Sequence, residues 1–274
     1  MARRLRILLL ALVAAMLLAP VAADARTALP KSIAATGNSL TRAAGTGFLP
    51  WTDNPAGSWS TGTDPSVNSH YLRLLALNPK IRGHNYNDAR SGAKMSELAA
   101  QMGTVVSQRA DYVTVEFGGN DVCASTETAM TSVSDYRAQF RAGLDRVTTG
   151  LANVKVFVAS VPNIYHLWQL YHDDLFAQIA WATFGVCQTM LANPTSTAQS
   201  DVDRRARVTQ RIVDYNAALA DVCAAYRQCL FDGNAAFDAQ FTKADVGHFD
   251  YFHPSLSGQA KFAAGTWAVS YWAP

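Results

Sequence analysis

The sequence lacks the motifs of several large classes of protein. It has no P-loop to cradle a nucleotide phosphate and no Gly-x-Ser-x-Gly elbow for a serine nucleophile. It also has no Cys-x-x-Cys pair, so the thiols do not indicate a zinc site. Lys plus Arg number 23 against 21 for Asp plus Glu, which is close to neutral. Nothing therefore indicates a nucleic acid as the partner, because domains that bind nucleic acids usually carry a clustered basic face.

Linkers and repeats are absent as well. The chain has no stretch rich in glycine and serine or in proline, no internal repeat and no heptad pattern. The roughly 250 residues from position 26 to the end of the sequence are enough to bury one large core. We therefore expect a single domain over residues 26–274, after an N-terminal segment of different composition.

Residues 1–25 have the pattern of an export signal. Three arginines among the first six residues precede an apolar run at residues 7–19, which is too short for a typical membrane span. Ala-Asp-Ala at residues 23–25 fits the small-x-small cleavage pattern, so we expect a mature chain from about Arg26, with 20 basic and 20 acidic residues. A retained membrane anchor fits the run less well, and the twin arginine leaves the export route open.

Four cysteines in an exported chain predict two disulfides. Three connectivities are possible. We favour Cys223 with Cys229, which closes a short loop, and Cys123 with Cys187, which ties together two long loops.

Short apolar segments alternate with longer helical patterns along the chain. Apolar residues recurring every three to four positions predict helices at residues 71–77, 94–108, 134–151, 205–226 and 259–272. Short β-branched runs predict strands at residues 32–36, 80–87, 112–117, 154–160 and 229–231. This alternation indicates an α/β fold in which a parallel sheet of about five strands is covered by helices on both faces.

Residues suited to catalysis follow three of the expected strands, where parallel sheets place their sites. Ser39 follows the first strand, Gly92 the second and Asn120 the third. The backbone N–H groups of Ser39 and Gly92 and the side-chain amide of Asn120 would be three donors around one oxyanion. Each residue also has an ordinary interpretation, as a helix N-cap, a turn glycine and a loop-capping asparagine respectively.

Asp250 and His253 lie three positions apart, after the last expected strand. A carboxylate on the same tight loop as an imidazole fixes the ring's tautomer and stabilises its protonated form. Such a pair activates a nucleophile, and with Ser39 it completes a Ser–His–Asp set. Taken singly, each residue also has an ordinary interpretation, His253 as a surface histidine and Asp250 as a loop acid or helix cap. Asp121 is expected to support its loop rather than to take part in chemistry.

These blocks resemble those of the SGNH (GDSL) hydrolase family, in which Ser, Gly, Asn and His come in this chain order with Asp three residues before His. They stand here as TGNSL, RSGA, FGGND and DYFHP, and the resemblance covers about residues 31–272. It implies a flavodoxin-like three-layer α/β/α fold and ester hydrolysis through an acyl-enzyme, with no metal or organic cofactor. FGGNDVC and VPNIYHLW are similar to stretches of exported actinobacterial lipases and phospholipase-like esterases of the family.

Asn38 departs from the family pattern, because the first block usually reads Gly-Asp-Ser and here reads Gly-Asn-Ser. Asparagine keeps the shape and part of the hydrogen bonding of aspartate but loses its charge. We expect Asn38 to be tolerated, because the other three blocks are intact. A large gain of activity in Asn38→Asp would contradict this expectation.

Histidines and aromatic residues give weaker indications. His166 with His172, Asp173 and Asp174 is the best candidate cluster for a metal, but its spacing matches no metal motif, and we interpret these as solvated loop residues. The aromatic residues beyond the first block and after the fourth strand either line a groove for an acyl chain or a sugar, or pack beneath a long loop. They are Trp51, Trp59, Tyr165, Trp168, Tyr171, Phe176, Trp181 and Phe184.

Together these features predict an exported, monomeric serine esterase of lipase or phospholipase-like type, which acts on a lipid or other acyl ester and has no stable membrane anchor. A carbohydrate O-deacetylase on the same scaffold is one alternative, and a chain-length series of p-nitrophenyl esters separates it from a lipase. A noncatalytic binding protein that retains the fold is the other, and covalent labelling of Ser39 by a fluorophosphonate would exclude it.

Overall fold

The computed structural model describes residues 28–273, so the expected signal segment at residues 1–25 lies outside the described part of the chain. Five strands form one parallel sheet in the order β2-β1-β3-β4-β5. They are β1 (Ile33–Gly37), β2 (Asn85–Asn87), β3 (Tyr112–Glu116), β4 (Lys155–Val158) and β5 (Cys229–Phe231). Every residue of β1 and β3 is buried, as in strands covered on both faces. The predicted parallel α/β sheet is confirmed.

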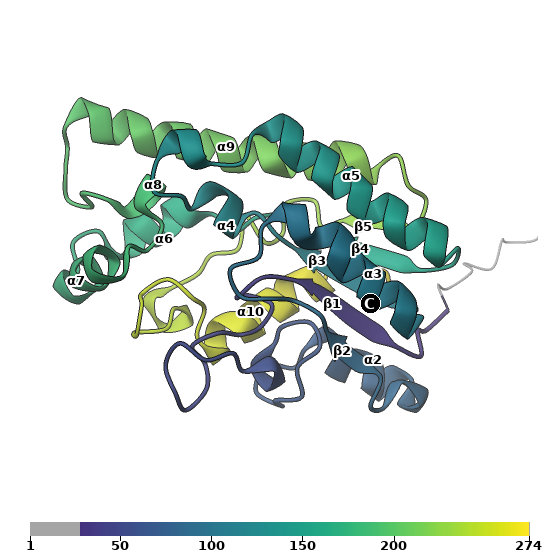
Figure 1. The fold of residues 1–274 in the computed structure, drawn as a ribbon. Helices are drawn as coiled ribbons and strands as arrows, with labels where there is room; N and C mark the ends of the chain where they lie inside the picture. The colour runs from purple at the N-terminus through teal and green to yellow at the C-terminus, as the bar shows by residue number, and fades with distance from the viewer. Residues whose placement is uncertain (1–27, 274) are drawn as a thin grey trace, which may run out of the picture.

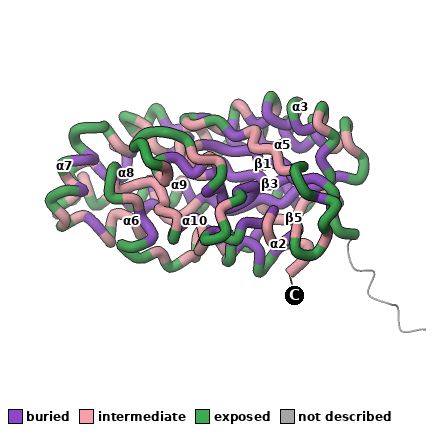
Figure 2. Tube along the Cα trace, turned by 90° about the horizontal axis from the view of Figure 1, so that it is seen from below, coloured by how far each residue is buried: buried purple, intermediate pink, exposed green. Residues whose placement is uncertain are grey.

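Helices cover the two faces of this sheet (Figure 1). One face carries α3 (Leu98–Gln108), α5 (Val133–Gly150) and α9 (Gln199–Cys223), and the other carries α2 (His70–Leu77) and α10 (Leu256–Trp267). Each face has its own apolar core, one centred on α3, α5 and α9 and one on α2 and α10. Figure 2 shows the buried chain gathered in the sheet between outer turns that are exposed.

The pattern of α5 shows how the sequence directs this packing. The Ser132 side chain caps the helix by accepting the N–H of Asp135. Tyr136 and Phe140 lie one turn apart on the stripe that the sequence predicted, and both are fully buried. The Tyr136 ring stacks on that of Tyr215 in α9 with 4.0 Å between centroids, so the stripe joins the two helices.

The second strand is shorter than predicted. Residues 79–81 form the 3-10 helix η2 (Pro79–Ile81), which the Asn78 side chain caps by accepting the N–H of Lys80. Residues 79–81 are therefore helical, and the chain turns at Gly83 with a φ of 75°, so pairing with β1 begins only at Asn85. The other short 3-10 helices are η1 (Pro55–Gly57), η3 (Met95–Glu97), η4 (Glu127–Ala129) and η5 (Lys243–Asp245).

The segment between β4 and α9 is helical, whereas the sequence suggested a long loop. It forms α6 (Ile164–Tyr171), α7 (Leu175–Phe184) and α8 (Gln188–Leu191). The side chains of Asn163 and Asp174 cap α6 and α7. These two residues were the features of the sequence from which the helix starts could have been predicted. Apolar residues surround α7 on both its buried and its exposed sides, so no amphipathic period marks it in the sequence.

Two disulfides are present, with the connectivity that we favoured. Cys123 caps the short helix α4 (Gly119–Val122), and its partner Cys187 begins α8. Cys223, the last residue of α9, is bonded to Cys229, the first residue of β5. The first disulfide therefore ties the helix that carries Asn120 to the α6–α8 segment.

Candidate active site

Ser39 lies in a tight turn directly after β1. A Cβ on Gly37 would come within 2.7 Å of the carbonyl oxygen of Glu116 on β3, so only glycine fits at the end of this strand. Beyond it, the side-chain oxygen of Asn38 accepts the backbone N–H of Leu40 at 2.9 Å. This bond closes the turn and places Ser39 at the carboxyl edge of the sheet.

His253 joins Ser39 to Asp250 through its two ring nitrogens. Nε2 lies 2.7 Å from Ser39 Oγ, and Nδ1 lies 2.5 Å from Asp250 Oδ2. The carboxylate accepts the Nδ1 proton, which leaves Nε2 as the acceptor for the Ser39 hydroxyl. The other oxygen, Asp250 Oδ1, accepts the backbone N–H groups of Phe252 and His253 at 2.9 and 3.0 Å.

The electrostatics of Asp250 favour its ionised form. Burial acts to raise the pKa of this carboxyl, but the hydrogen bonds and charge of His253 and the N–H of Phe252 outweigh it and lower the pKa below its ordinary value. The carboxylate therefore stays charged beside the imidazole at neutral pH and can stabilise the ring when it takes up a proton.

The loop that carries this pair is held from both sides. The N–H of Gly247 donates to the carbonyl of His253 at 2.8 Å. From α7, Trp181 Nε1 donates to the carbonyl of Tyr251 at 3.1 Å. Tyr251 has a φ of 54°, a left-handed backbone that is uncommon outside glycine. Trp181 thus braces the site from a helix that the sequence did not reveal.

Three hydrogen-bond donors border the cavity beside Ser39. The backbone N–H groups of Ser39 and Gly92 have no hydrogen-bond partner within residues 28–273. Gly92 has a φ of 82°, which glycine adopts without strain. The Asn120 amide donates one hydrogen to the carbonyl of Ala93 at 3.0 Å and has a second to offer. Ser39, Gly92, Asn120 and His253 line one cavity, an arrangement that suits a developing negative charge.

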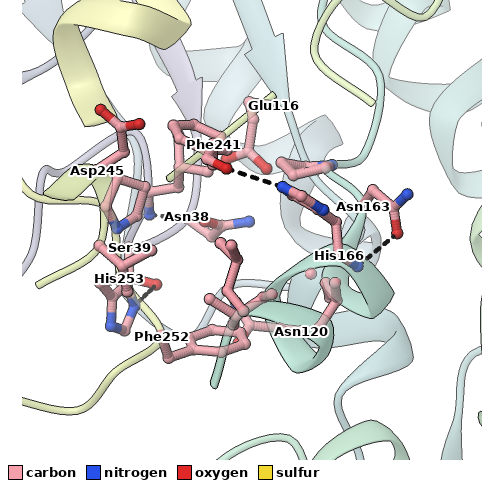
Figure 3. A pocket seen from close by; sticks show the side chains of 18 residues that line it. Asn38, Ser39, Glu116, Asn120, Asn163, His166, Phe241, Asp245, Phe252 and His253 are labelled. Carbon is pink, nitrogen blue, oxygen red and sulfur yellow. Dashed lines mark hydrogen bonds between the residues drawn. The ribbon is translucent and has the colours of Figure 1, made fainter. Parts of the chain in front are cut away.

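Ser39 and His253 also border a second cavity, which is mainly apolar (Figure 3). Its walls come from α6 and from the loop before α10, and the apolar side chains are Leu40, Ile164, Leu167, Leu170, Phe241, Val246 and Phe252. Polar side chains from the sheet edge, among them Asn38, Glu116 and Asn120, border the same cavity. The two cavities meet at Ser39 and His253, so a bound molecule has room on each side of the reacting atoms.

The interpretation of His166 as a solvated loop residue is wrong. It lies on α6, and its Nε2 is 2.8 Å from the carbonyl oxygen of Phe241 across the apolar cavity, because the cap at Asn163 turns this segment into a helix (Figure 3). Asp174 is the cap of α7. Within the described residues, no three His, Cys, Asp or Glu side chains gather to hold a metal ion.

The aromatic residues divide between core and surface. Trp59 is fully buried, and its Nε1 donates to the Thr41 hydroxyl at 3.3 Å. Trp51 is 54% exposed and packs edge-on against Phe184 and Phe249, with centroid distances of 4.6 and 4.2 Å. Burial of Trp59, Tyr171 and Trp181 agrees with the packing interpretation, whereas the groove for an acyl chain or a sugar stays a prediction for exposed Trp51, which borders a cavity.

The sheet, its covering helices and the polar residues at its carboxyl edge define an α/β hydrolytic enzyme. The sequence matches the GDSL-like Lipase/Acylhydrolase family over residues 35–261, and the chain belongs to this family. The predicted family is thereby confirmed.

Similar proteins include lipid and carbohydrate esterases. Mouse "Phospholipase B1, membrane-associated" is 29% identical over 176 residues, which cover 52% of this chain but only 12% of that protein. The crystal structure of LAE5, an alpha/beta hydrolase enzyme from the metagenome of Lake Arreo, has a TM-score of 0.53 at 17% identity and covers 87% of this chain and 96% of its own. The Clostridium thermocellum family 3 carbohydrate esterase has a TM-score of 0.51 at 17% identity, with coverages of 86% and 92%. At these identities the structural likeness shows the shared fold alone.

Proposed function

We propose that this chain is an exported serine ester hydrolase of lipase or phospholipase-like type, with Ser39 as nucleophile, His253 as general base and Asp250 as the residue that orients it. The observation that carries this proposal is the unbroken hydrogen-bonded chain from Asp250 Oδ2 through the His253 ring to Ser39 Oγ, with distances of 2.5 and 2.7 Å. The distance from His253 Nε2 to Ser39 Oγ lies within the range in which a proton can be passed directly, and the contact with Asp250 orients the ring for that transfer.

Acylation begins when Ser39 Oγ attacks the carbonyl carbon of the ester. His253 Nε2 takes the hydroxyl proton as the new C–O bond forms, and Asp250 stabilises the resulting imidazolium. The carbonyl oxygen becomes an oxyanion, which the N–H groups of Ser39 and Gly92 and the amide of Asn120 hold. His253 then gives its proton to the leaving oxygen, and the alcohol departs from an acyl-enzyme on Ser39.

Deacylation repeats these steps with water as the nucleophile. His253 Nε2 takes a proton from the water as its oxygen attacks the acyl carbonyl, and the same three donors hold the second oxyanion. When that intermediate collapses, the proton returns from His253 to Ser39 Oγ. The carboxylic acid leaves, and the site regains its starting state with all atoms balanced.

The apolar cavity supports an acyl chain as the group that binds beside Ser39. Leu167 and Leu170 from α6 and Phe241 from the opposite loop line it, and such walls favour hydrocarbon over a hydrated sugar. Because Ser39 and His253 form part of its lining, an acyl chain bound in this cavity lies next to the reacting atoms.

Export and a monomeric state belong to the same proposal. Two disulfides support an oxidising compartment, because such bonds persist outside the cytosol. No helix within residues 28–273 has the length and apolar character needed to span a bilayer. Detection of the mature chain in culture medium, with its N-terminus sequenced, tests export and the expected start near Arg26. Light scattering tests the monomer.

Two measurements test the catalytic assignment. Ser39→Ala should abolish hydrolysis of p-nitrophenyl esters, and activity that survives this change would remove the central claim. A fluorophosphonate should label the wild-type protein at Ser39 and leave Ser39→Ala unlabelled. An unlabelled wild-type protein would instead favour the noncatalytic alternative.

A carbohydrate O-deacetylase is the second candidate. Trp51 and Phe249 border the cavity on the other side of Ser39, where exposed rings can stack on a sugar, and the fold resembles that of a carbohydrate esterase. A series of p-nitrophenyl esters from acetyl upwards separates the two. A lipase-like enzyme should have its highest kcat/KM at medium or long acyl chains, whereas a deacetylase should accept only acetyl.

A further inference from the structure

Glu116 is a buried acid that the proposed reaction does not use. It ends β3 in register with Gly37, is only 1% exposed and borders the cavity next to Ser39. Its carboxylate accepts a hydrogen bond from the Thr41 hydroxyl at 3.3 Å, and Asn38, which borders the same cavity, acts to lower its pKa. Burying a carboxylate costs free energy, so its place under the nucleophile turn calls for a role.

Asn38 connects this carboxylate to the turn that holds Ser39. Its Oδ1 accepts the N–H of Leu40, so its NH₂ group is the part left to donate, and Asn38 lowers the pKa of Glu116 as a donor to the carboxylate does. A carboxamide can donate to the acid on one side while it accepts from the backbone on the other. Aspartate has only acceptors when ionised, and at position 38 it would set two carboxylates against each other.

We propose that Glu116 is a positioning residue for the nucleophile, supplying from β3, through Asn38, the negative charge that a Gly-Asp-Ser block carries beside its serine. This role rests on the proposed function of Ser39. It also explains the departure at Asn38, because the amide and the carboxylate form a matched pair and neither is expected to tolerate exchange alone.

The surroundings of Glu116 make its charge sensitive to pH. Burial raises its pKa to about 7 against the opposing bonds of Thr41 and Asn38, and the nearby charge of Asp121 raises it further. Tyr136 from α5 is the other titratable group coupled to it. The titratable groups that border the same cavity are His166, Asp245 and His253.

Exchanging the two side chains tests this pairing. In Asn38→Asp, one of two facing carboxylates must hold a proton for the turn to keep its shape. We expect its kcat/KM for p-nitrophenyl acetate to fall about tenfold for each pH unit above the point at which that proton leaves. Adding Glu116→Gln to this variant returns one carboxylate and one amide to the pair. The double variant should recover to within about threefold of wild type and lose the alkaline fall.

Controls separate positioning from general damage. Glu127→Gln, at a surface acid paired with Arg207, should keep the wild-type pH profile. Thermal unfolding followed against pH gives a second readout, in which Asn38→Asp should lose stability on the alkaline side and the double variant should not. An alkaline fall that persists in the double variant, or an Asn38→Asp profile equal to wild type, overturns the role of Glu116. Failure of the fluorophosphonate to label the wild type would instead overturn the proposed function.

A second, independent observation is an exposed apolar surface beside the site, which we call the apolar rim. It comes from the loop after the Ser39 turn, from α7 and from the loop before His253. Its side chains are all at least 37% exposed and are Phe48, Leu49, Trp51, Leu175, Phe176, Ile179, Phe184 and Phe249. No residue of α7 is charged. Exposed apolar surfaces of this kind mark sites of interaction with proteins or membranes.

One part of the apolar rim borders the opening of the site. Trp51 packs against Phe184 and Phe249, and both Trp51 and Phe249 border the cavity that contains Ser39 and His253. Whatever covers Trp51 and Phe249 therefore also stands over this opening. A folded partner or a second copy seated there would obstruct the entry of an ester, whereas a lipid surface would deliver one.

We infer that the apolar rim docks this protein on the surface of a lipid aggregate whose headgroups are zwitterionic. The absence of charge on α7 fits such a surface better than an anionic one, which basic residues would attract. Docking of this kind rests on the proposed function, since the aggregate is then also the source of the substrate.

Sedimentation with phosphatidylcholine vesicles tests this docking. Phe176→Ser combined with Ile179→Ser removes two exposed side chains of α7 that border neither cavity, and we expect vesicle binding to weaken at least about tenfold. Val202→Ser with Val213→Ser on α9 is the control, because these valines are also exposed apolar residues, at 42% and 41%, and lie outside the apolar rim. The control pair should bind as wild type does.

Three outcomes overturn the lipid assignment. They are a wild-type protein that does not sediment with vesicles, equal loss of binding in both variant pairs, and a dimer that the α7 pair abolishes, which would assign the rim to a second copy. Hydrolysis of dissolved p-nitrophenyl acetate needs no lipid surface, so it tests the proposed function separately.

Discussion

His253 Nε2 lies 2.7 Å from Ser39 Oγ although 214 positions separate the two residues in the sequence. The helix that follows His253 is tied directly to the Ser39 turn, because Gln259 of α10 donates to the carbonyl of Leu40 at 2.8 Å and accepts the N–H of Trp59 at 2.9 Å. Packing of α10 on the sheet therefore brings the histidine loop to the carboxyl end of β1.

The first prediction concerns Asp250. Asp250→Asn keeps the shape of the side chain but replaces the carboxylate by a neutral amide. The amide no longer holds the His253 ring in the tautomer with the proton on Nδ1, and it has no negative charge to stabilise the imidazolium. We expect kcat for a soluble ester to fall on the order of 10³- to 10⁴-fold with little change in thermal unfolding. Asp238→Asn, at an exposed acid, is the control. A loss of less than about tenfold in Asp250→Asn would speak against the orienting role.

The second prediction concerns the stability contributed by Glu116. Its pKa rises from 4.5 to about 7 on folding, chiefly through burial. Between these values the folded chain binds a proton that the unfolded chain has released, so this stabilisation is complete below pH 4.5 and is lost as the pH rises through 7.

Glu116→Gln removes this titration. The unfolding free energy of the variant relative to wild type should therefore rise with pH, by on the order of 3 kcal/mol across the window. Urea denaturation at a series of pH values measures the difference. A difference that stays constant with pH would contradict the raised pKa, whatever the activity of the variant.

The third prediction concerns the apolar cavity. Leu167 projects into it from α6, and Leu167→Trp should fill part of the space for an acyl chain. We expect kcat/KM for medium and long p-nitrophenyl esters to fall at least about tenfold, while the acetyl ester, which needs no such space, keeps most of its rate. Leu77→Trp, at the exposed end of α2 and outside both the cavity and the apolar rim, is the matched control. An equal loss for every ester would place the acyl chain elsewhere.

The fourth prediction compares the two disulfides. Cys123 and Cys187 are 64 positions apart and Cys223 and Cys229 only six, so the first closes a far longer loop in the unfolded chain. Replacing each pair by serine should cost about 4 kcal/mol for the long loop and about 2 kcal/mol for the short one on the chain-entropy account. Chemical denaturation of both double variants measures the order, and the reverse order would refute this account.

The same pairs differ in their expected effect on catalysis. Cys123 ends α4, the helix that carries Asn120, whereas Cys223 and Cys229 join α9 to β5. Loss of the long-loop disulfide should therefore lower kcat as well as stability, and loss of the short one should lower stability alone.

Local patterns were sufficient to predict the sheet and the helices that cover it. The apolar runs of β3 and β4 and the apolar stripe of α5 predict these elements well, because the residues that form the apolar pattern are also the buried residues. Prediction failed where a single residue overrides a pattern. The 3-10 helix η2, capped by Asn78, replaces the start of the predicted second strand, and Asn163 and Asp174 cap helices in a segment without a clear period.

The candidate site was predicted only in part, and the omissions have a common cause. Ser39, Gly92 and Asn120 follow the ends of strands, where glycine and polar residues in the sequence predict a turn. Glu116 belongs to a buried strand and was read as part of its apolar run, although an acid there was a usable signal. Trp181 acts on the site from another element, for which the sequence holds no local indication.

By itself the sequence determined the family, the α/β class and the residue types at the strand ends, because each depends on short-range patterns of turn and period. Tertiary structure alone decided that Asn38 and Glu116 border one cavity, and that Phe184 of α7 packs against Trp51, which borders the cavity beside Ser39. The physical reason is that such pairings depend on which strands and helices pack together. Long-range packing aligns Gly37 with Glu116 across β1 and β3, and no local pattern in either segment records that register.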